Sequence, residues 1–446
     1  MGSVLTAAIV VAIHLFSVTA APAADSASSF RRDVARIFIE RCVACHRFDR
    51  AEGGYRADNY ASIVGVGDSD LSGVIKGKPG ESEVFRRVIA EDPAARMPFE
   101  GEPLPADEIA VLKAWILAGA SYDAKDPTAA LATIVPAAVY PKPPRVYPAS
   151  WPIAALAFSR NEEQLYVGGY HEVTVWTPKE GRLIARLANL PERILGLSLH
   201  PDGRQLAVAG GQPGRVGDVR VIDVETQEVT RVLLQAVGVA LNVEWSPGGD
   251  RLAVSAADGA VRVYDASSGT VSFTVRPHSD WVYATAWSTD GKQLTTGSRD
   301  GTAKVLATDN GRTLASYRGH GKPVRGLAFT PDGKYVFSAA GKEVHRWKTD
   351  DGNREGDPIT LEGEVTGMVG RGATFFVATD APKLYRVDGT TAKLSGEAIV
   401  LRELPLSVAT SNDGMRVAVG HFDGQVGVWV GEAKEQTGEF SATPVQ

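Results

Sequence analysis

The chain has 446 residues, a formal net charge of −6 at pH 7 and an isoelectric point of about 5.8. This acidic balance provides no basic footprint for nucleic acid, so nucleic-acid binding is not expected. The length exceeds what one ordinary hydrophobic core supports, and we therefore expect a multidomain protein.

The N-terminal segment, residues 1–24, resembles a secretory signal peptide. Its apolar run over residues 4–18 is too short to span a bilayer comfortably, and Ala21-Pro22-Ala23 provides a small-residue cleavage site. No Lys or Arg precedes the run, so an uncleaved membrane anchor is the alternative. No second apolar run reaches transmembrane length. We expect a periplasmic or otherwise exported protein, attached to a membrane only if this segment stays uncleaved.

Residues 25–125 form the first predicted domain, which is small and all-α. Apolar residues recur at helical spacing over residues 30–45, 81–90 and 105–119, and this periodicity predicts three short helices. A domain of this size has a thin core, and an embedded cofactor would supply much of the missing apolar volume.

The first of these helices ends in the motif Cys42-Val43-Ala44-Cys45-His46. In a C-x-x-C-H pattern the two thiols form thioethers with a haem, and the imidazole becomes an axial ligand of its iron. The alternatives are a disulfide, a thioredoxin-like redox pair and half of a zinc site. The chain has no other cysteine for a four-ligand zinc site, and the flanks lack the βαβ pattern of a redox pair. We predict one covalently attached haem c.

Met97 is the predicted second axial ligand of the iron. It is the only methionine of this domain, and His46 is the only histidine between residues 30 and 125. The alternative role of Met97 is to fill a gap in the core. Ligation by His and Met closes both axial positions, so we expect outer-sphere electron transfer by a carrier rather than catalysis on a bound substrate.

Three further residues of this domain, Tyr55, Arg56 and Arg96, are candidates for hydrogen bonds to the haem propionates. The guanidinium group matches a carboxylate geometrically. The alternative is that these three side chains are solvated surface.

The haem motif is accompanied by four short segments, at residues 51–56, 76–83, 96–98 and 112–116. Together they resemble the planctomycete-type cytochrome c domain, a family that places a small haem c module beside other exported domains, often propellers. The resemblance implies cytochrome function. It assigns haem attachment and iron ligation to Cys42, Cys45, His46 and Met97. It does not supply a redox partner.

Residues 126–150 are rich in proline and are predicted to be a linker. Seven prolines lie between residues 127 and 152, and Pro141-Lys142-Pro143-Pro144 predicts an extended, semi-rigid spacer. A spacer of this length allows either a fixed docking of the two domains or a loose tether.

Residues 151–446 contain a repeated unit and form the second predicted domain. Seven units succeed one another at intervals of 38 to 46 residues, a spacing typical of four-stranded propeller blades. Several units contain an aromatic strand followed by a Pro or Asp-Gly turn, as in Phe329-Thr330-Pro331-Asp332-Gly333. We therefore predict an all-β, seven-bladed propeller.

The units resemble WD repeats, most closely at Gly319-His320 and in the segment of residues 300–305. The terminal Trp-Asp pair is altered, for example to Tyr264-Asp265, and the histidine before each unit survives only at His278 and His320. We therefore expect incomplete polar networks in the blades. The resemblance implies a rigid platform that binds proteins through its loops.

Four other propeller histidines are candidate ligands of a second cofactor. A lone histidine in a turn is more often structural or exposed, so none is predicted to be a ligand. These residues are His171, His200, His345 and His421.

Three functions are compatible with the sequence. The first is an exported mono-haem electron carrier whose propeller docks a redox partner. The second is a propeller-based binding protein in which haem senses redox state. The third is an enzyme with a second cofactor in the propeller, resembling nitrite reductases that join a c-type domain to a propeller. Those propellers have eight blades, whereas seven units are counted here.

Overall fold

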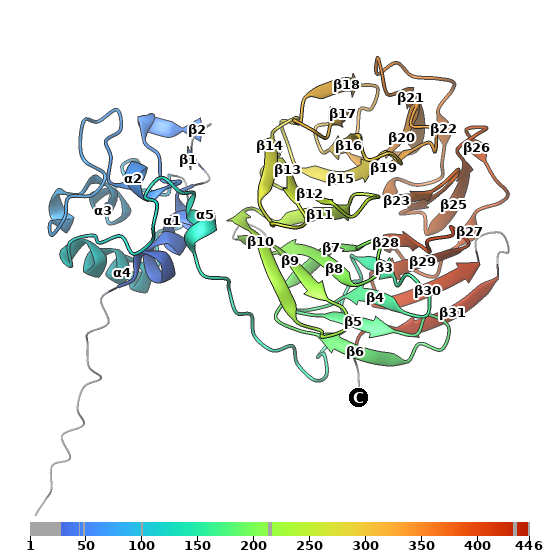
Figure 1. The fold of residues 1–446 in the computed structure, drawn as a ribbon, viewed down its shortest axis with the longest axis horizontal. Helices are drawn as coiled ribbons and strands as arrows, with labels where there is room; N and C mark the ends of the chain where they lie inside the picture. Colours follow the sequence, from blue (N-terminus) through green and yellow to red (C-terminus); the bar gives the residue numbers. More distant parts are fainter. Residues whose placement is uncertain are drawn as a thin grey trace, which may run out of the picture.

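The computed structural model describes residues 28–43, 45–47, 50–99, 101–212, 216–430 and 435–444. The expected signal segment, residues 1–24, lies outside the described residues. Within the part described, no helix is long and apolar enough to cross a membrane. Figure 1 shows a helical region at the N-terminal side and a β-propeller that follows it.

The helical region, residues 28–134, is built from short elements around one apolar core. Its first expected helix is shorter than the predicted span of residues 30–45, because the chain turns at Cys42. The elements are η1 (Phe30–Val34), α1 (Ala35–Arg41), β1 (His46–Arg47), β2 (Arg50–Ala51), η2 (Glu52–Gly54), α2 (Tyr60–Ile63), η3 (Pro79–Glu81), α3 (Glu83–Val88), α4 (Ala106–Leu117) and α5 (Leu131–Ile134).

An aromatic cluster fills the core of the helical region. The Phe30 ring meets the Tyr60 ring edge-on at 5.1 Å and lies 5.4 Å from the Trp115 ring. Trp115 is fully buried, and its indole N–H donates to the carbonyl of Ser121 at 3.0 Å. The buried donor is thereby satisfied, as large aromatic side chains require. This cluster ties η1 to α2 and α4.

The propeller consists, in the part of the chain that the structure describes, of seven antiparallel sheets, which confirms the predicted number of blades. Blades 1 to 4 contain β3 (Leu156–Phe158), β4 (Leu165–Gly168), β5 (Val173–Trp176), β6 (Leu183–Leu187); β7 (Arg193–Leu199), β8 (Gln205–Gly211), β9 (Val216–Asp223), β10 (Val229–Val237); β11 (Ala240–Trp245), β12 (Arg251–Ala256), β13 (Val261–Asp265), β14 (Val271–Val275); β15 (Val282–Trp287), β16 (Gln293–Ser298), β17 (Ala303–Ala307), β18 (Thr313–Tyr317).

Blades 5 to 7 follow the same order. They contain β19 (Val324–Phe329), β20 (Tyr335–Ala340), β21 (Glu343–Lys348), β22 (Ile359–Thr360); β23 (Val365–Arg371), β24 (Thr374–Thr379), β25 (Lys383–Asp388), β26 (Lys393–Leu394), β27 (Ile399–Val400); β28 (Pro405–Thr410), β29 (Arg416–His421), β30 (Gln425–Val430), β31 (Gln436–Ser441). In blade 6 the outer position is shared by β26 and β27, which both pair with β25.

Apolar side chains between successive blades hold the ring together. Between blades 2 and 3, for example, Val219 and Val221 share a cluster with Val243, Trp245 and Val254. Because the inner strands are covered by neighbouring blades on both sides, both of their faces are apolar, as in strands of any doubly covered sheet. This apolar packing allows the ring to close although most blades lack the terminal Trp-Asp pair.

The ring closes between blades 7 and 1 without exchange of a strand. Each of these blades is made from four consecutive strands. Backbone bonds join the entry of the propeller to its end: Ile153 N donates to the carbonyl of His421 (3.1 Å), and Tyr147 N donates to the carbonyl of Pro444 (2.9 Å). The Ser407 hydroxyl donates to the carbonyl of Ile153 (2.7 Å). The segment before blade 1 thus takes part in closure.

The proline-rich segment divides into two parts. Its beginning returns to the helical region, where Leu131 N donates to the carbonyl of Asp58 (3.0 Å) and α5 forms. Its remainder, residues 135–150, contains no helix or strand and runs along blades 2 and 1; we call it the strap. The helical region also contacts blade 2 directly, since α1 and α5 lie against β10.

Candidate haem site

The C-x-x-C-H motif forms a tight turn directly after α1. The amides of Cys42 and Val43 both bond to the carbonyl of Phe38, and the amides of Cys45 and His46 both bond to the carbonyl of Cys42. This winding brings two thiols and an imidazole onto one turn. The cysteines are free rather than joined in a disulfide, and both are half-buried. Burial raises the pKa of the Cys42 thiol to about 12, so it is held protonated.

His46 is oriented by a backbone hydrogen bond. Its Nδ1 lies 3.2 Å from the carbonyl oxygen of Tyr55, and the edge of the Tyr55 ring meets the imidazole at 5.6 Å. A carbonyl oxygen can only accept, so Nδ1 carries the proton and Nε2 keeps its lone pair. Histidines that bind metals are commonly held in this way by a carbonyl on the other nitrogen.

Tyr55 and Arg56 already have protein partners. The Tyr55 hydroxyl donates to the carbonyl of Ile63 at 2.7 Å, and burial raises the pKa of this phenol well above its usual value. Arg56 forms a two-bond ion pair with Asp58, at 2.9 and 3.2 Å. Both side chains are therefore already engaged in bonds within the protein. Their contact with haem propionates stays a prediction.

Met97 lies in the loop between α3 and α4 and is half-buried. Its amide donates to the carbonyl of Arg87 at 3.0 Å, and the peptide bond to Pro98 is cis. The neighbouring Arg96 differs from Arg56 in one respect, because its buried Nε has no hydrogen-bond partner. A buried, unpartnered guanidinium N–H suits a carboxylate acceptor such as a propionate. This orphaned donor fits the predicted group.

Two polar interactions that the sequence did not predict stabilise the helical region, and the first lies directly beside the motif. Arg41, the last residue of α1, makes a two-bond ion pair with Glu108 of α4, at 2.9 and 2.7 Å. The fully buried Ser82 hydroxyl accepts from the amide of Ile75 (2.8 Å) and donates to the carbonyl of Lys78 (2.9 Å). The sequence places Glu108 in the first turn of a helix and Arg41 beside the motif. It does not indicate that these two residues, 67 positions apart, form an ion pair.

The donor set as a whole suits a haem c. Two free thiols and an imidazole with an available Nε2 lie on one turn, and a thioether and an unpartnered guanidinium N–H lie on one loop. Soft thioether and imidazole donors are the ligands of low-spin cytochrome iron. In the described residues there is no group of three or more His, Cys, Asp or Glu side chains arranged to hold a metal ion. Whether the predicted ligands bind iron stays a prediction.

The four candidate histidines of the propeller have hydrogen-bond partners within the fold. Nδ1 of His171 lies 3.0 Å from the carbonyl of Leu190, and Nδ1 of His421 lies 3.0 Å from that of Glu403. His345 bonds to Tyr317 and Glu343, and His200 bonds to Gly249.

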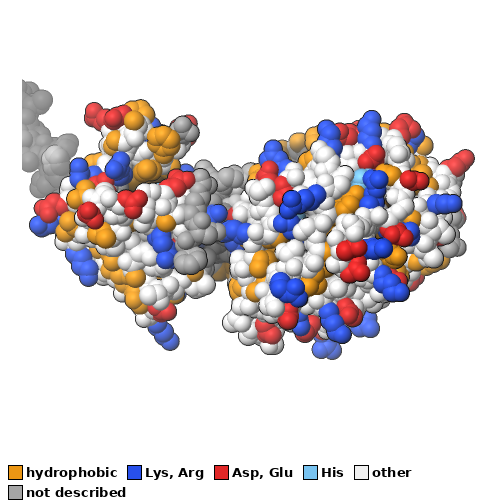
Figure 2. Space-filling model, turned by 90° about the horizontal axis from the view of Figure 1, so that it is seen from above, with side chains coloured by type: hydrophobic (Ala, Val, Ile, Leu, Met, Phe, Trp, Pro, Cys, Tyr) orange, Lys and Arg blue, Asp and Glu red, His pale blue; other side chains and the backbone are white. Residues whose placement is uncertain are grey.

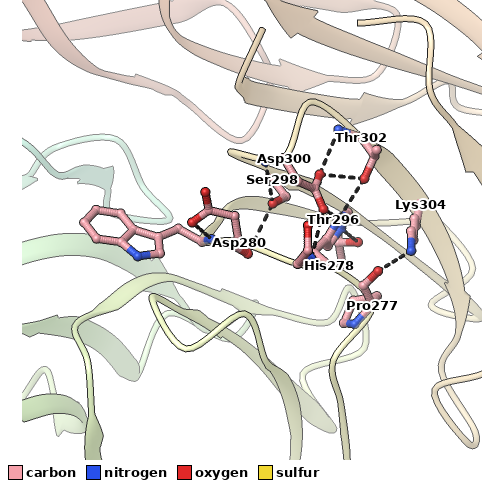
Figure 3. A network of polar contacts seen from close by, with 10 residues as sticks. Pro277, His278, Asp280, Thr296, Ser298, Asp300, Thr302 and Lys304 are labelled. Atoms are coloured by element: carbon pink, nitrogen blue, oxygen red, sulfur yellow. Dashed lines mark hydrogen bonds and ion pairs between the residues drawn. The ribbon is translucent and has the colours of Figure 1, made fainter. Parts of the chain in front are cut away.

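Blade 4 contains a polar network around His278, although Leu306-Ala307 stands there in place of the terminal Trp-Asp pair. Nε2 of His278 lies 2.9 Å from the Thr296 hydroxyl, and its Nδ1 lies 2.9 Å from the Thr302 hydroxyl (Figure 3). Asp300 bonds to both His278 and Thr302. Burial lowers the pKa of His278. One histidine, one aspartate and two threonines of this blade thus form a network without a tryptophan.

An exposed row of aromatic and arginine side chains crosses blades 4 and 5. The Trp281 ring, 39% exposed, lies 6.2 Å from the Tyr283 ring. Arg299 stacks over Trp281 at 5.4 Å, and the exposed Arg325 stacks over Tyr283 at 5.0 Å. Exposed Trp and Arg are typical of protein interfaces. We call these four residues the aromatic row. On the face shown in Figure 2, acidic and basic side chains are interspersed.

Fold and site together define a class: a helical region with a c-type haem motif, followed by a WD-type propeller. Residues 42–101 match the family model for planctomycete cytochrome C. Residues 269–305 and 311–348 match the WD domain, G-beta repeat, and residues 234–285 match the anaphase-promoting complex subunit 4 WD40 domain. These matches confirm the resemblance read from the sequence. They support a haem-binding propeller protein and a propeller that binds proteins.

One solved structure illustrates the propeller. A chain of the crystal structure of the mitotic checkpoint complex is 20% identical, with a TM-score of 0.57, and the match covers 66% of this chain and 96% of that chain. At this identity the likeness concerns the fold alone. A search of curated proteins gave no match.

Proposed function

We propose that the protein is an exported mono-haem cytochrome of the c type, with a separate propeller domain that docks a redox partner. The observation that carries the proposal is the bond between His46 Nδ1 and the carbonyl of Tyr55, which leaves Nε2 available as a ligand. The similarity of residues 42–101 to planctomycete cytochrome C supports it. The apolar N-terminal run supports export.

Each residue of the site has a distinct task. Cys42 and Cys45 would attach the haem, and His46 and Met97 would be its axial ligands. Arg96 would bind a propionate through its unpartnered Nε. Bound haem would supply reversible one-electron transfer. The ion pair of Arg41 and Glu108 holds the turn against α4, so that the ligands keep their positions.

The aromatic row is the surface that best suits a protein partner. It combines an exposed indole with two stacked guanidinium groups, and such side chains account for much of the binding energy at interfaces. The same observation favours the second candidate function, in which partner binding is the main task and haem reports redox state.

Haem content tests the main proposal. The full chain would be produced in a host that attaches haem c in its periplasm, and the pyridine haemochrome spectrum would be measured. We expect one haem c per chain, found in the periplasmic fraction. The variants Cys42→Ser and Cys45→Ser should each lose one thioether and shift the spectrum. Absence of covalent haem, or a second type of haem, would overturn the proposal.

Cross-linking in the periplasm separates the two candidates. We expect the partner that cross-links to the unaltered chain to be lost from Trp281→Ala and Arg325→Ala, and kept by Phe422→Ala, which alters an exposed aromatic residue of blade 7. For a carrier, Met97→Ala should keep the cross-link but slow electron exchange with that partner. An unchanged physiological activity of Met97→Ala would favour the binding role.

A further inference from the structure

The strap is bonded to blade 2 by a buried ion pair. The Tyr140 hydroxyl of the strap donates to Oδ2 of Asp218 at 2.8 Å. Arg220 donates to the same carboxylate at 2.9 and 3.0 Å, and it also donates to the strap carbonyl of Ala138 at 2.5 Å. Asp218 and Arg220 are 0% and 1% exposed. Tyr140 therefore closes a ring of bonds that starts and ends in the strap.

Blade 1 repeats this arrangement seven residues further along the strap. The Tyr147 hydroxyl donates to Oε1 of Glu172 at 2.6 Å, and Arg186 donates to both oxygens of that carboxylate at 2.6 Å. Arg186 then donates to the strap carbonyls of Pro144 (2.7 Å) and Arg145 (3.0 Å). Glu172 is fully buried. Tyrosine, carboxylate, arginine and strap carbonyl thus recur in the same order, and we call each set a clamp.

Aromatic contacts add to both clamps. The Arg220 guanidinium lies 4.6 Å from the Tyr140 ring, which is 5.6 Å from the ring of His171. The Trp151 ring lies 4.9 Å from the Tyr170 ring and 6.4 Å from the Tyr147 ring. The tyrosines of the strap are therefore packed as well as hydrogen-bonded. Burial raises the pKa of both Tyr140 and Tyr147 and keeps their hydroxyls protonated as donors.

The propeller and the strap need each other energetically. A buried carboxylate and arginine are costly unless their remaining hydrogen-bonding capacity is used. In both clamps the strap uses part of that capacity, through one tyrosine hydroxyl and at least one carbonyl, while Oδ1 of Asp218 has no hydrogen-bond partner. A detached strap would leave Asp218 and Glu172 each without its phenolic donor. It would also remove the Ala138 carbonyl from Arg220 and the Pro144 and Arg145 carbonyls from Arg186. A loose tether would not pair with two buried charges in this way.

The helical region meets the propeller where the first clamp lies. α1 and α5 are in contact with β10, which has nine residues, whereas the outer strands β6, β14 and β18 have five each. Burial raises the pKa of Asp218 in the first clamp. The positive charges of Arg220 and of Arg36, which lies on α1, offset part of this rise. The long outer strand β10 thus provides a contact surface for α1, the helix that precedes Cys42.

We propose that the strap, its two clamps and β10 form a docking surface on blades 1 and 2 for the helical region of the same chain. This surface fixes the C-x-x-C-H turn in one position relative to the propeller. The sequence allowed either a loose tether or a fixed docking, and the clamps select the fixed one. The proposal goes beyond the proposed function and does not depend on haem.

Small-angle X-ray scattering of the full chain tests the proposal without any substitution. We expect the wild-type curve to fit one rigid arrangement with α1 against β10. A curve that requires a broad mixture of separations between the helical region and the propeller would overturn the proposal, whatever the variants do.

Tyrosine variants then test the clamps themselves. Tyr140→Phe and Tyr147→Phe keep each ring and remove each donor, and Tyr335→Phe on β20 is the matched control. Limited proteolysis within residues 135–147 reports opening of the strap when reclosing is fast. We expect the double variant to be cleaved at least tenfold faster and to scatter as a more extended particle, with the control unchanged. Equal cleavage of the wild-type protein and the double variant would overturn the proposal.

Discussion

The Nδ1 atom of His46 lies 3.2 Å from the carbonyl oxygen of Tyr55, and the hydroxyl of the same tyrosine is bonded to the carbonyl of Ile63. One residue therefore orients the predicted iron ligand and is itself anchored to α2. A side chain added at Gly73 would meet the Tyr55 hydroxyl at 2.8 Å, so the anchor is also enclosed. The orientation of His46 depends on packing around a residue nine positions later in the chain.

Removing this anchor should destabilise the helical region. In Tyr55→Phe the carbonyl of Ile63 loses its donor, and a buried polar group left without a partner costs about 1–3 kcal/mol. We expect a loss of this size in urea unfolding of the full chain, followed by circular dichroism. Tyr122→Phe, which removes an exposed hydroxyl bonded to Asp126, should cost less than about 0.5 kcal/mol. Equal losses in the two variants would contradict the assigned role.

Met97→Ala should open one axial position of the iron. The reduced wild-type protein is expected not to bind carbon monoxide at neutral pH, because both positions are filled. The reduced variant should bind it readily, as seen in the visible absorption spectrum. Met415→Ala, at an exposed position of the propeller, is the control and should behave as the wild type. Ready binding by the wild type would exclude ligation by Met97.

Ser82→Ala tests whether the serine hydroxyl stabilises the turn formed by the Lys-Gly-Lys-Pro-Gly-Glu-Ser segment. The buried hydroxyl joins the amide of Ile75 to the carbonyl of Lys78, so its removal leaves a buried N–H unpaired. The expected loss of stability is about 1–3 kcal/mol. Ser69→Ala, at an exposed position in the same region, should change it by less than about 0.5 kcal/mol. Urea titration at one pH measures both, and a neutral Ser82→Ala would show that the hydroxyl is dispensable.

His320 should make the propeller less stable in acid. Burial, with the neighbouring His345 at 4.2 Å, lowers the pKa of His320 from 6.5 to about 3. Between these values the unfolded chain binds more protons than the native one. Its contribution to stability is therefore complete above pH 6.5 and is lost as the pH falls toward 3, by up to about 1.4 kcal/mol per pH unit.

The test is the slope of unfolding free energy against pH between 4 and 6.5. In His320→Gln we expect a shallower slope than in the wild type. The slope should not vanish, because burial also lowers the pKa of His278 and His345. Stability at pH 7 is compared separately, so that the packing cost of the substitution is not counted as titration. Parallel slopes would show that His320 is protonated in the native state at these pH values.

The local features of the fold could be read from the sequence. The C-x-x-C-H motif and the seven units depend on residues close together in the chain. The clamps could not be predicted in the same way. Asp218 and Arg220 pair with Tyr140 across about eighty residues, and no local pattern marks a strand carboxylate as the acceptor of a distant phenol.

The partners of the blade histidines could not be predicted for a related reason. The altered Trp-Asp ends indicated missing bonds, but they did not show that Thr296 and Thr302 supply hydroxyls to His278. The unpartnered Nε of Arg96 was equally invisible, because only the folded chain shows which donors stay unused.

Because the strap takes part in closing the ring, it determines where an isolated propeller fragment has to begin. A fragment that begins at Trp151 would lose the bond from Tyr147 to Pro444 and would expose the carboxylates of Glu172 and Asp218 without their phenols. A fragment that begins at Ala138 would retain both. Partner searches with an isolated propeller should therefore use the longer fragment. The shorter one would expose polar groups that are buried in the full chain, and these could bind other proteins nonspecifically.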